Sequence, residues 1–330
     1  MIEIACASAQ DRSDLIRTVA GEMKMQPAIV EKDFWVCYTL DHLFHRSEFG
    51  DSIVFKGGTS LSKAYRIIER FSEDIDLILD WRLIGYGVDE PWEDRSNTKQ
   101  DKFKLETIER TDRFLAGKFA PSIRGSISEE LGVEVDIRPA AEEETVIFAY
   151  PRAFSSTATL DVIRLEIGPL AAWLPSSNAT ITPYAAERHP DVFSSPSTTV
   201  RTAVPERTFW EKATILHQEA NRPEGKAMPR RYSRHYYDMY RLGHSKVSER
   251  AIEHPELLAK VVAFKEKFYR TPWSKLADAK PGTLKLVPPE HRVPELGRDY
   301  DAMLPIIFGE APALEEILSF VGELEKRVNG

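Results

Sequence analysis

The stretch FKGGTSLSKAYRIIERFSEDIDLIL, residues 55–79, combines a glycine pair, a cluster of hydroxyl side chains and two alternating aspartates. The overlapping run SIVFKGG, residues 52–58, predicts a short buried strand that ends in glycines. TSLSKAYRIIERF, residues 59–71, predicts a helix, and DIDLIL, residues 74–79, predicts a second strand. The stretch therefore predicts one strand–helix–strand unit.

The glycine turn of this unit raises the question of phosphate binding. Free backbone amides and the helix dipole favour an anion at such a turn. The stretch is not a Walker A loop, because Ser62 stands before Lys63 where that loop requires glycine, and it does not follow GxGxxG. A Gly-Gly turn alone is more typical of tight packing between a strand and a helix than of a ligand site.

The two aspartates add a second feature. Side chains at i and i+2 of a strand point to the same face, so Asp74 and Asp76 are expected to project together. Neighbouring carboxylates repel each other, and a divalent cation such as Mg²⁺, which prefers oxygen ligands, relieves that repulsion. The alternative is a pair of solvated carboxylates at the end of a strand.

The length and the remaining patterns predict two lobes. A chain of 330 residues exceeds the roughly 250–300 at which a single core stops growing. Alternating β-branched runs predict further strands over residues 132–139, 144–151 and 158–168. Beyond a Pro-, Ser- and Thr-rich stretch at about 175–205, helical patterns follow, among them 205–220, 248–269 and 311–328. We expect one lobe over residues 1–200, with N-terminal helices, and a helical lobe over residues 201–330.

Charge and composition restrict the setting. The net charge of -8 gives no global attraction to nucleic acid, so such a partner needs a local basic surface. Cys6 and Cys37 have no metal-binding spacing, and so few thiols argue against a secreted disulfide scaffold. The N-terminus shows no signal-peptide pattern, and no run approaches the roughly 20 apolar residues of a membrane span. We therefore expect a cytoplasmic protein without membrane contact.

One local basic surface is KAMPRRYSRHYYDMYRL, residues 226–242. Arg230, Arg231 and Arg234 alternate there with tyrosines, and arginine and tyrosine suit phosphates and stacked bases. These three arginines are the predicted acceptor-binding residues. The alternative is a solvated helix face whose tyrosines lie in the core.

Four motifs together resemble a known family. GGTSLSK (57–63) followed by RFSEDIDL (70–77), an R-x-S-x-D-x-D pattern, resembles the opening motifs of the AbiEii-type nucleotidyltransferase toxins, to which the MenT toxins also belong. WEKATILH and SRHYYDMYRL are similar to the third and fourth motifs of that family, with Lys212 and Asp238 at the matching positions. The resemblance covers roughly residues 28–242. It implies an α+β fold, the polymerase-beta-like nucleotidyltransferase mixed sheet flanked by helices, with a C-terminal helical lobe.

The resemblance also implies roles for residues. Asp74 and Asp76, with Glu166 from VIRLEIG as the third carboxylate, are expected to hold Mg²⁺. Lys212 is expected to bind a phosphate oxygen, Asp238 to orient either Lys212 or the incoming hydroxyl, and Ser72 to contact the nucleotide or metal-bound water. The nucleotide phosphates are expected at the glycine turn, on the residues Gly57, Gly58, Thr59, Ser60 and Lys63.

Each of the less specific assignments has a simpler alternative. Glu166 shares a strand face with Arg164, and in the simpler alternative it forms an ion pair with Arg164 and holds no metal. Lys212 and Asp238 are then surface or lobe-bridging ion-pair residues, and Lys63 is a solvated residue on a helix.

The implied function is transfer of a nucleotide from an NTP to an acceptor by the toxin of a toxin–antitoxin pair. Within the family tRNA is the expected acceptor, and a cognate antitoxin is the expected protein partner. Two alternatives stay open: nucleotide transfer to a protein, and a nucleotide-binding regulatory protein that does not catalyse. The intact Asp-x-Asp pair argues against the second.

Overall fold

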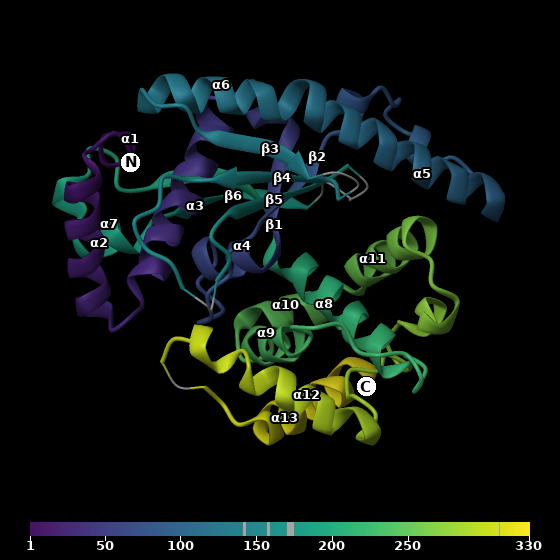
Figure 1. Cartoon of the computed structure of the whole chain (residues 1–330). Coiled ribbons are helices and arrows are strands. Elements are labelled where there is room, and N and C mark those ends of the chain that lie inside the picture. Colours follow the sequence, from purple (N-terminus) through teal and green to yellow (C-terminus); the bar gives the residue numbers. More distant parts are fainter. Residues whose placement is uncertain (141–142, 157–158, 170–174, 310) are drawn as a thin grey trace. The chain divides into compact units, whose positions relative to one another are not determined.

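The computed structural model describes residues 1–140, 143–156, 159–169, 175–309 and 311–330 (Figure 1). The chain divides into two compact units. The first contains Met1–Ala64 and Ser72–Ala203, and the second contains Tyr65–Phe71 and Val204–Gly330. The sequence predicted a first lobe over residues 1–200, which contains Tyr65–Phe71, whereas in the structure this segment belongs to the second unit.

The first unit is built on a seven-stranded mixed sheet with the order β3-β4-β5-β2-β1-β7-β6. The central β2 runs antiparallel to β1 and parallel to β5, and β1 runs parallel to β7. The β3–β4, β4–β5 and β6–β7 pairs are antiparallel. The strands are β1 (Ile53–Lys56), β2 (Ile75–Leu79), β3 (Asp136–Ala140), β4 (Thr145–Ala149), β5 (Ile163–Gly168), β6 (Ser176–Ile181) and β7 (Thr198–Ala203). This mixed sheet with its helices confirms the predicted α+β fold class.

Two strands lie where the sequence predicted none. β6 and β7 fall in the Pro-, Ser- and Thr-rich stretch, and β6 closes one end of the sheet with mostly exposed or half-buried residues. A polar edge strand lacks the apolar run by which a buried strand is recognised. The strand predicted over 158–168 begins at Ile163, and residue 158 lies outside the described residues.

The helices of the first unit cover the sheet and its edge. Helix α6 packs on β3, and α3 packs on β7. A π-helical turn at Leu115–Phe119 joins α5 to α6, so the two form one long rod beside β3 (Figure 1). The helices are α1 (Ile2–Ala5), α2 (Ala9–Met23), α3 (Pro27–His45), α4 (Gly57–Lys63), α5 (Asn97–Phe114), α6 (Ala120–Leu131) and α7 (Tyr184–Arg188).

The helix predicted over residues 59–71 is wrong in its second half. Helix α4 ends at Lys63, and Arg66 has a positive φ of 53° that no helix accommodates. The following segment is extended: the Phe71 amide donates to the Ile306 carbonyl at 2.8 Å, and the Phe308 amide donates to the Glu69 carbonyl at 2.6 Å. Pairing within the second unit thus satisfies backbone groups that the predicted helix would have satisfied locally.

The second unit is helical, as predicted. Its α-helices are α8 (Pro205–Ala220), α9 (Ser233–Gly243), α10 (Lys246–Glu253), α11 (Pro255–Phe268), α12 (Val293–Asp301) and α13 (Leu314–Asn329). The single helix predicted over 248–269 is instead split into α10 and α11 at His254, because the following Pro255 disfavours a helical residue before it and has no amide to donate. In the part of the chain that the structure describes, no helix combines the length and the apolar character needed to cross a membrane.

Candidate functional site

The sheet register places the candidate residues of the first unit in one row. Lys56 on β1 is opposite Asp76 on β2, and Asp76 is opposite Glu166 on β5. Glu166 is in turn opposite Thr145 on β4. Directly opposed residues of neighbouring strands present their side chains on the same face. Asp76 and Glu166, far apart in the sequence, therefore lie side by side.

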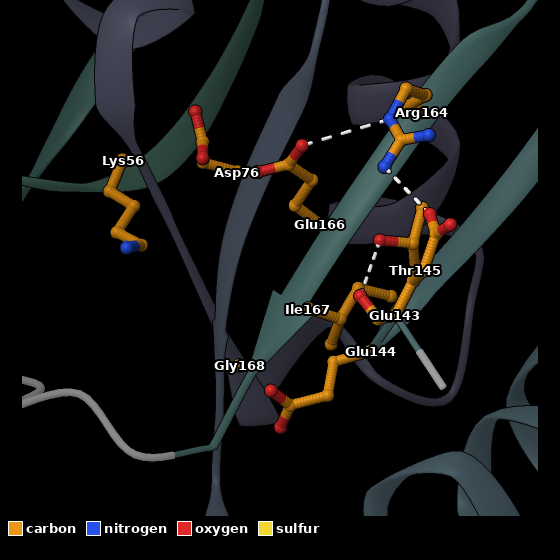
Figure 2. Close-up of a pocket in the computed structure, with 9 residues that line it drawn as sticks. All are labelled: Lys56, Asp76, Glu143, Glu144, Thr145, Arg164, Glu166, Ile167 and Gly168. Carbon is orange, nitrogen blue, oxygen red and sulfur yellow. Dashed lines mark hydrogen bonds and ion pairs between the residues drawn. The ribbon is translucent and has the colours of Figure 1, made fainter. Parts of the chain in front are cut away.

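The row forms part of an acidic pocket (Figure 2). Its lining includes the carboxylates of Asp76, Glu143, Glu144 and Glu166, and the pocket is completed by Lys56, Thr145, Arg164, Ile167 and Gly168. With four carboxylates against two cationic side chains, the lining is suited to a cation of more than one charge.

Arg164 bridges two of these carboxylates. Its Nη2 lies 3.0 Å from Glu143 Oε2, and its Nε lies 3.7 Å from Glu166 Oε1. The predicted alternative for Glu166, an ion pair with Arg164, is therefore present. The Glu166 side chain is 47% exposed and the contact is long, so the pair does not fully occupy its carboxylate.

Gly57 makes the glycine turn part of this site. Its φ is +81°, and a Cβ built on it would lie 1.9 Å from Asp76 Oδ2 and 2.6 Å from Asp76 Cγ. The Asp76 carboxylate thus rests directly against the backbone of the turn, and only glycine leaves room for it. The turn packs tightly, as the simpler alternative predicted, and the residue it packs against is a candidate metal ligand.

The hydroxyls of the turn are used within it. The Thr59 hydroxyl donates to the carbonyl of Asp74, and the Ser60 hydroxyl donates to the Gly57 carbonyl at 2.8 Å. Both residues are buried, whereas Gly57 and the neighbouring Gly58 are half-buried. The hydroxyls therefore fix the shape of the turn, and a role in phosphate binding rests on its backbone amides.

Lys63 is placed differently from either prediction. Its Nζ lies 2.8 Å from Asp33 Oδ1 and 3.8 Å from the centre of the Tyr184 ring, and the side chain is buried. It is neither solvated nor part of the pocket lining. Its charge is paired with a carboxylate inside the first unit, and a contact of Lys63 with phosphate stays a prediction.

Asp74 and Ser72 precede β2 and are half-buried. Neither belongs to the pocket lining. Across the described ranges, no group of three or more His, Cys, Asp or Glu residues is gathered closely enough to hold a metal. The structure thus brings Asp76 and Glu166 together and leaves Asp74 outside the pocket that they share.

Glu144 is the pocket carboxylate with a strongly shifted pKa. Burial, and then the negative charge of Asp112, raise the pKa of Glu144 to about 7. The backbone amide of Glu144 donates to Asp112 Oδ1 at 3.3 Å, and this bond holds the Asp112 carboxylate beside Glu144. A carboxylate that exchanges its proton near neutral pH therefore lines the pocket.

Sequence reasoning missed a buried triplet on α3. Glu31, Lys32 and Asp33 are consecutive charged residues, and all three are buried. Lys32 Nζ lies 2.7 Å from Glu73 Oε2, and Glu73 directly precedes Asp74 in the chain. Asp33 forms an ion pair with Lys63 at the end of α4. Three adjacent charged residues, flanked by AIV and FWVCY, were the available signal, because charged residues are almost never fully buried unless paired.

The triplet also holds loops of the first unit. Glu31 accepts from the backbone amides of residues 153 and 154 at 2.8 and 3.0 Å, and Asp33 accepts from the Tyr184 amide at 2.6 Å. Glu73 accepts from the Leu160 amide at 2.8 Å. The triplet thus fixes the glycine-turn helix, the start of β2 and the loop after β4 to one helix.

In the second unit, Lys212 and Asp238 form a buried ion pair with a third member, Arg70. Lys212 Nζ lies 2.7 Å from Asp238 Oδ2. Arg70 donates from Nε to Asp238 Oδ1 at 2.7 Å and from Nη2 to Oδ2 at 2.8 Å. Arg70 is the arginine of the R-x-S-x-D-x-D pattern, to which sequence reasoning gave no role. Since the pair is buried, the surface ion pair foreseen as an alternative is wrong.

Burial and the neighbouring charges together set the pKa values of this cluster. Burial lowers the pKa of Lys212, and Asp238 opposes that shift while Arg70 adds to it. Burial raises the pKa of Asp238, but Arg70 and Lys212 more than offset this and leave it below its ordinary value. His235 Nδ1 lies 3.4 Å from Lys212 Nζ, and burial together with Lys212 lowers the His235 pKa well below its ordinary value. His235 is therefore a neutral neighbour of Lys212.

The predicted acceptor surface is only partly as expected. Arg230 and Arg231 are exposed and Arg234 is half-buried, but Tyr236 and Tyr237 lie fully in the core. The core alternative therefore holds for these two tyrosines, which are not available to stack on bases.

The chain is similar to known proteins both in sequence and in structure. The family model described as "Nucleotidyl transferase AbiEii toxin, Type IV TA system" matches residues 39–320, which extends past the resemblance seen in the sequence motifs. No curated protein matches the chain. Among solved structures, MenT4, a nucleotidyltransferase toxin from Mycobacterium tuberculosis H37Rv, is similar with a TM-score of 0.48 and 16% sequence identity, over 97% of this chain and 99% of that chain. Because the family model spans most of the sequence, the chain belongs to the AbiEii nucleotidyltransferase toxin family of type IV toxin–antitoxin systems.

Proposed function

We propose that the protein transfers a nucleoside monophosphate from an NTP to an RNA acceptor, most simply tRNA, in a reaction that depends on Mg²⁺. The observation that carries the proposal is the row across the sheet. Asp76 and Glu166 are direct neighbours on β2 and β5, and the Asp76 carboxylate rests on the Gly57 turn.

The donor set fits Mg²⁺. Both side chains offer hard carboxylate oxygens, and Mg²⁺ sites that act on nucleotides commonly use one or two carboxylates, with water and substrate phosphates as the other ligands. A third protein ligand is thus not required, although Asp74 stays a candidate for that role. When bound, the ion stabilises the charge that develops on the pyrophosphate leaving group.

The protein's own groups supply binding and orientation. We assign phosphate contacts to the backbone amides of the 57–60 turn and to Lys56, which is opposite Asp76 in the register. Ser72 keeps its proposed contact with the nucleotide or with metal-bound water.

Lys212 is assigned a contact with a phosphate oxygen. Asp238 was predicted to orient either Lys212 or the incoming hydroxyl, and its contacts favour one of these roles. Both of its oxygens already accept hydrogen bonds from Arg70, and Lys212 shares one of them. Orienting Lys212 is therefore favoured over accepting a proton from the incoming hydroxyl.

The acceptor is proposed from surface charge and the partner from the family. Exposed Arg230 and Arg231 offer charge for an RNA backbone, and the family implies a cognate antitoxin. An NTP substrate and a tRNA acceptor would place the protein in the cytoplasm.

The test uses the full chain with each α-³²P-labelled NTP, total cellular RNA and either Mg²⁺ or EDTA. RNA and protein are resolved on one gel. We expect label on a tRNA-sized band with Mg²⁺, none with EDTA, and none with Asp76→Asn or Asp74→Ala. Asp136→Asn, which changes an exposed carboxylate on β3, is the matched control and should label normally.

Each other outcome is informative. Label on protein alone would replace the RNA acceptor by a protein. Transfer by Asp76→Asn at the wild-type rate would refute the metal assignment. Nucleotide binding without any transfer would favour the non-catalytic alternative.

A further inference from the structure

Asp238 is a single carboxylate shared by two buried cations. Arg70 binds it through two parallel hydrogen bonds, one to each oxygen, at 2.7 and 2.8 Å. Lys212 Nζ lies 2.7 Å from Oδ2, the oxygen that Arg70 Nη2 also contacts. Asp238 is fully buried and the Lys212 residue is 7% exposed. The two cations therefore compete for one negative charge in a place that bulk water hardly screens.

The competition favours Arg70. A planar guanidinium with two hydrogen bonds to a carboxylate is held in geometry as well as in charge, whereas an ammonium interacts as a point charge. The other neighbour of Lys212, His235 Nδ1 at 3.4 Å, is a neutral imidazole and brings no negative charge. Lys212 is thus left with a positive charge that Asp238 compensates only in part.

We infer that Arg70 is a positioning residue: by occupying both oxygens of Asp238 it keeps the charge of Lys212 available for a phosphate group of the nucleotide. This inference rests on the phosphate contact proposed for Lys212 and adds a residue that acts through it. Without Arg70, Asp238 turns wholly to Lys212, and the two form a closed pair with little attraction for an anion.

Arg70 also has a simpler possible role, which is to anchor segment Tyr65–Phe71 in the second unit. That segment is held independently by its two backbone hydrogen bonds to residues 306–308 and by the ion pair of Arg241 Nη2 with Glu69 Oε1 at 3.0 Å. Arg241→Gln is therefore the matched control, because it removes an arginine that holds the same segment without touching Asp238.

The test measures binding of inorganic pyrophosphate to the full chain by titration calorimetry, with EDTA present so that no metal contributes. We expect Arg70→Gln to weaken binding roughly tenfold, the size of one lost charge-assisted interaction. Arg241→Gln should bind as the wild type does. The double variant Arg70→Gln/Asp238→Asn should return to within about threefold of the wild type, because it frees Lys212 from the carboxylate.

The double variant separates charge from architecture. If Arg70 only anchors the segment, removing Asp238 as well cannot restore binding. The inference is overturned if Arg70→Gln binds pyrophosphate as tightly as the wild type, if the double variant binds no better than Arg70→Gln, or if the wild type does not bind pyrophosphate.

Folding and catalysis are controlled separately. If Arg70→Gln does not fold, the double variant carries the test, since it removes the Arg70–Asp238 pair together and keeps the net charge of the cluster, which Lys212 then carries alone. It should bind pyrophosphate, and adding Lys212→Gln should abolish that binding; binding that persists refutes the inference. Pyrophosphate binding needs no turnover, so a chain that binds with this pattern but transfers no nucleotide would refute the proposed function and leave the role of Arg70 intact.

Discussion

Replacing Gly57 with alanine should disable the site while leaving the protein folded. The new Cβ would lie 1.9 Å from Asp76 Oδ2, which has to retreat by about 1.5 Å to reach an ordinary separation of 3.4 Å. A displacement of about 1 Å at a reacting centre commonly costs on the order of 100-fold in rate. The positive φ of the residue adds a stability cost of about 1–2 kcal/mol for alanine. For a unit of this size that lowers Tm by roughly 2–8 °C.

The assay compares initial rates of labelled nucleotide transfer with thermal unfolding followed by circular dichroism. Gly125→Ala is the matched control, because Gly125 lies within α6 with nothing near its Cβ position. That change should keep the rate and raise stability by roughly 0.5–1 kcal/mol. In an Asp76→Ala background the stability cost of Gly57→Ala should shrink, since the carboxylate it strikes is gone. Wild-type transfer by Gly57→Ala would refute the claim that this glycine exists to seat Asp76.

Three further outcomes are expected. Glu166→Gln should raise the Mg²⁺ concentration needed for half-maximal transfer by roughly tenfold or more, because a unit charge at contact distance near a surface is worth about 1–4 kcal/mol, and an unchanged Mg²⁺ dependence of the initial rate would contradict its role. Glu144 binds its proton more tightly in the folded than in the unfolded chain, so between about pH 4.5 and 7 stability should fall as pH rises, by at most about 3 kcal/mol. In Glu144→Gln the free energy of unfolding, measured by urea titration, should fall less between these pH values. A pH dependence equal to that of the wild type would count against the shifted pKa. Asp33→Asn should cost about 3–5 kcal/mol in the same assay by leaving Lys63 buried without its charge partner, whereas Asp33→Leu/Lys63→Met should cost much less, and equal costs would mean that the pair is not the reason.

The local features of the site could be predicted from the sequence where strand periodicity determines them. Asp76 lies on β2 with its side chain on the face opposite Leu77, as a period of two requires. That Glu166 is its neighbour depends on the register between β2 and β5, which no local pattern contains. Glu166 was chosen because of a resemblance, and its place beside Asp76 required the structure.

The errors have the same origin. Residues 65–71 have a helical pattern, but hydrogen bonds with residues 306–308 replace the helix, and these partners are more than 230 positions away. The role of Arg70 could not be foreseen because its carboxylate partner lies 168 residues later in the chain. The ion pair of Lys63 was missed as well, because its partner Asp33 stands thirty positions before it in the chain. In each case tertiary contacts overrode a local preference.

The charged triplet of α3 has a consequence for how the first unit folds. Successive residues of a helix point about 100° apart, so Glu31, Lys32 and Asp33 face three different directions and meet three separate segments of the chain. A partly assembled unit would bury at least one of these charges without its partner, at a cost of several kcal/mol. Intermediates in which α3 has docked on only some of its neighbours are therefore penalised. The first unit is expected to fold as one cooperative block around this helix, so the glycine turn and the strand of Asp76 acquire their final geometry together.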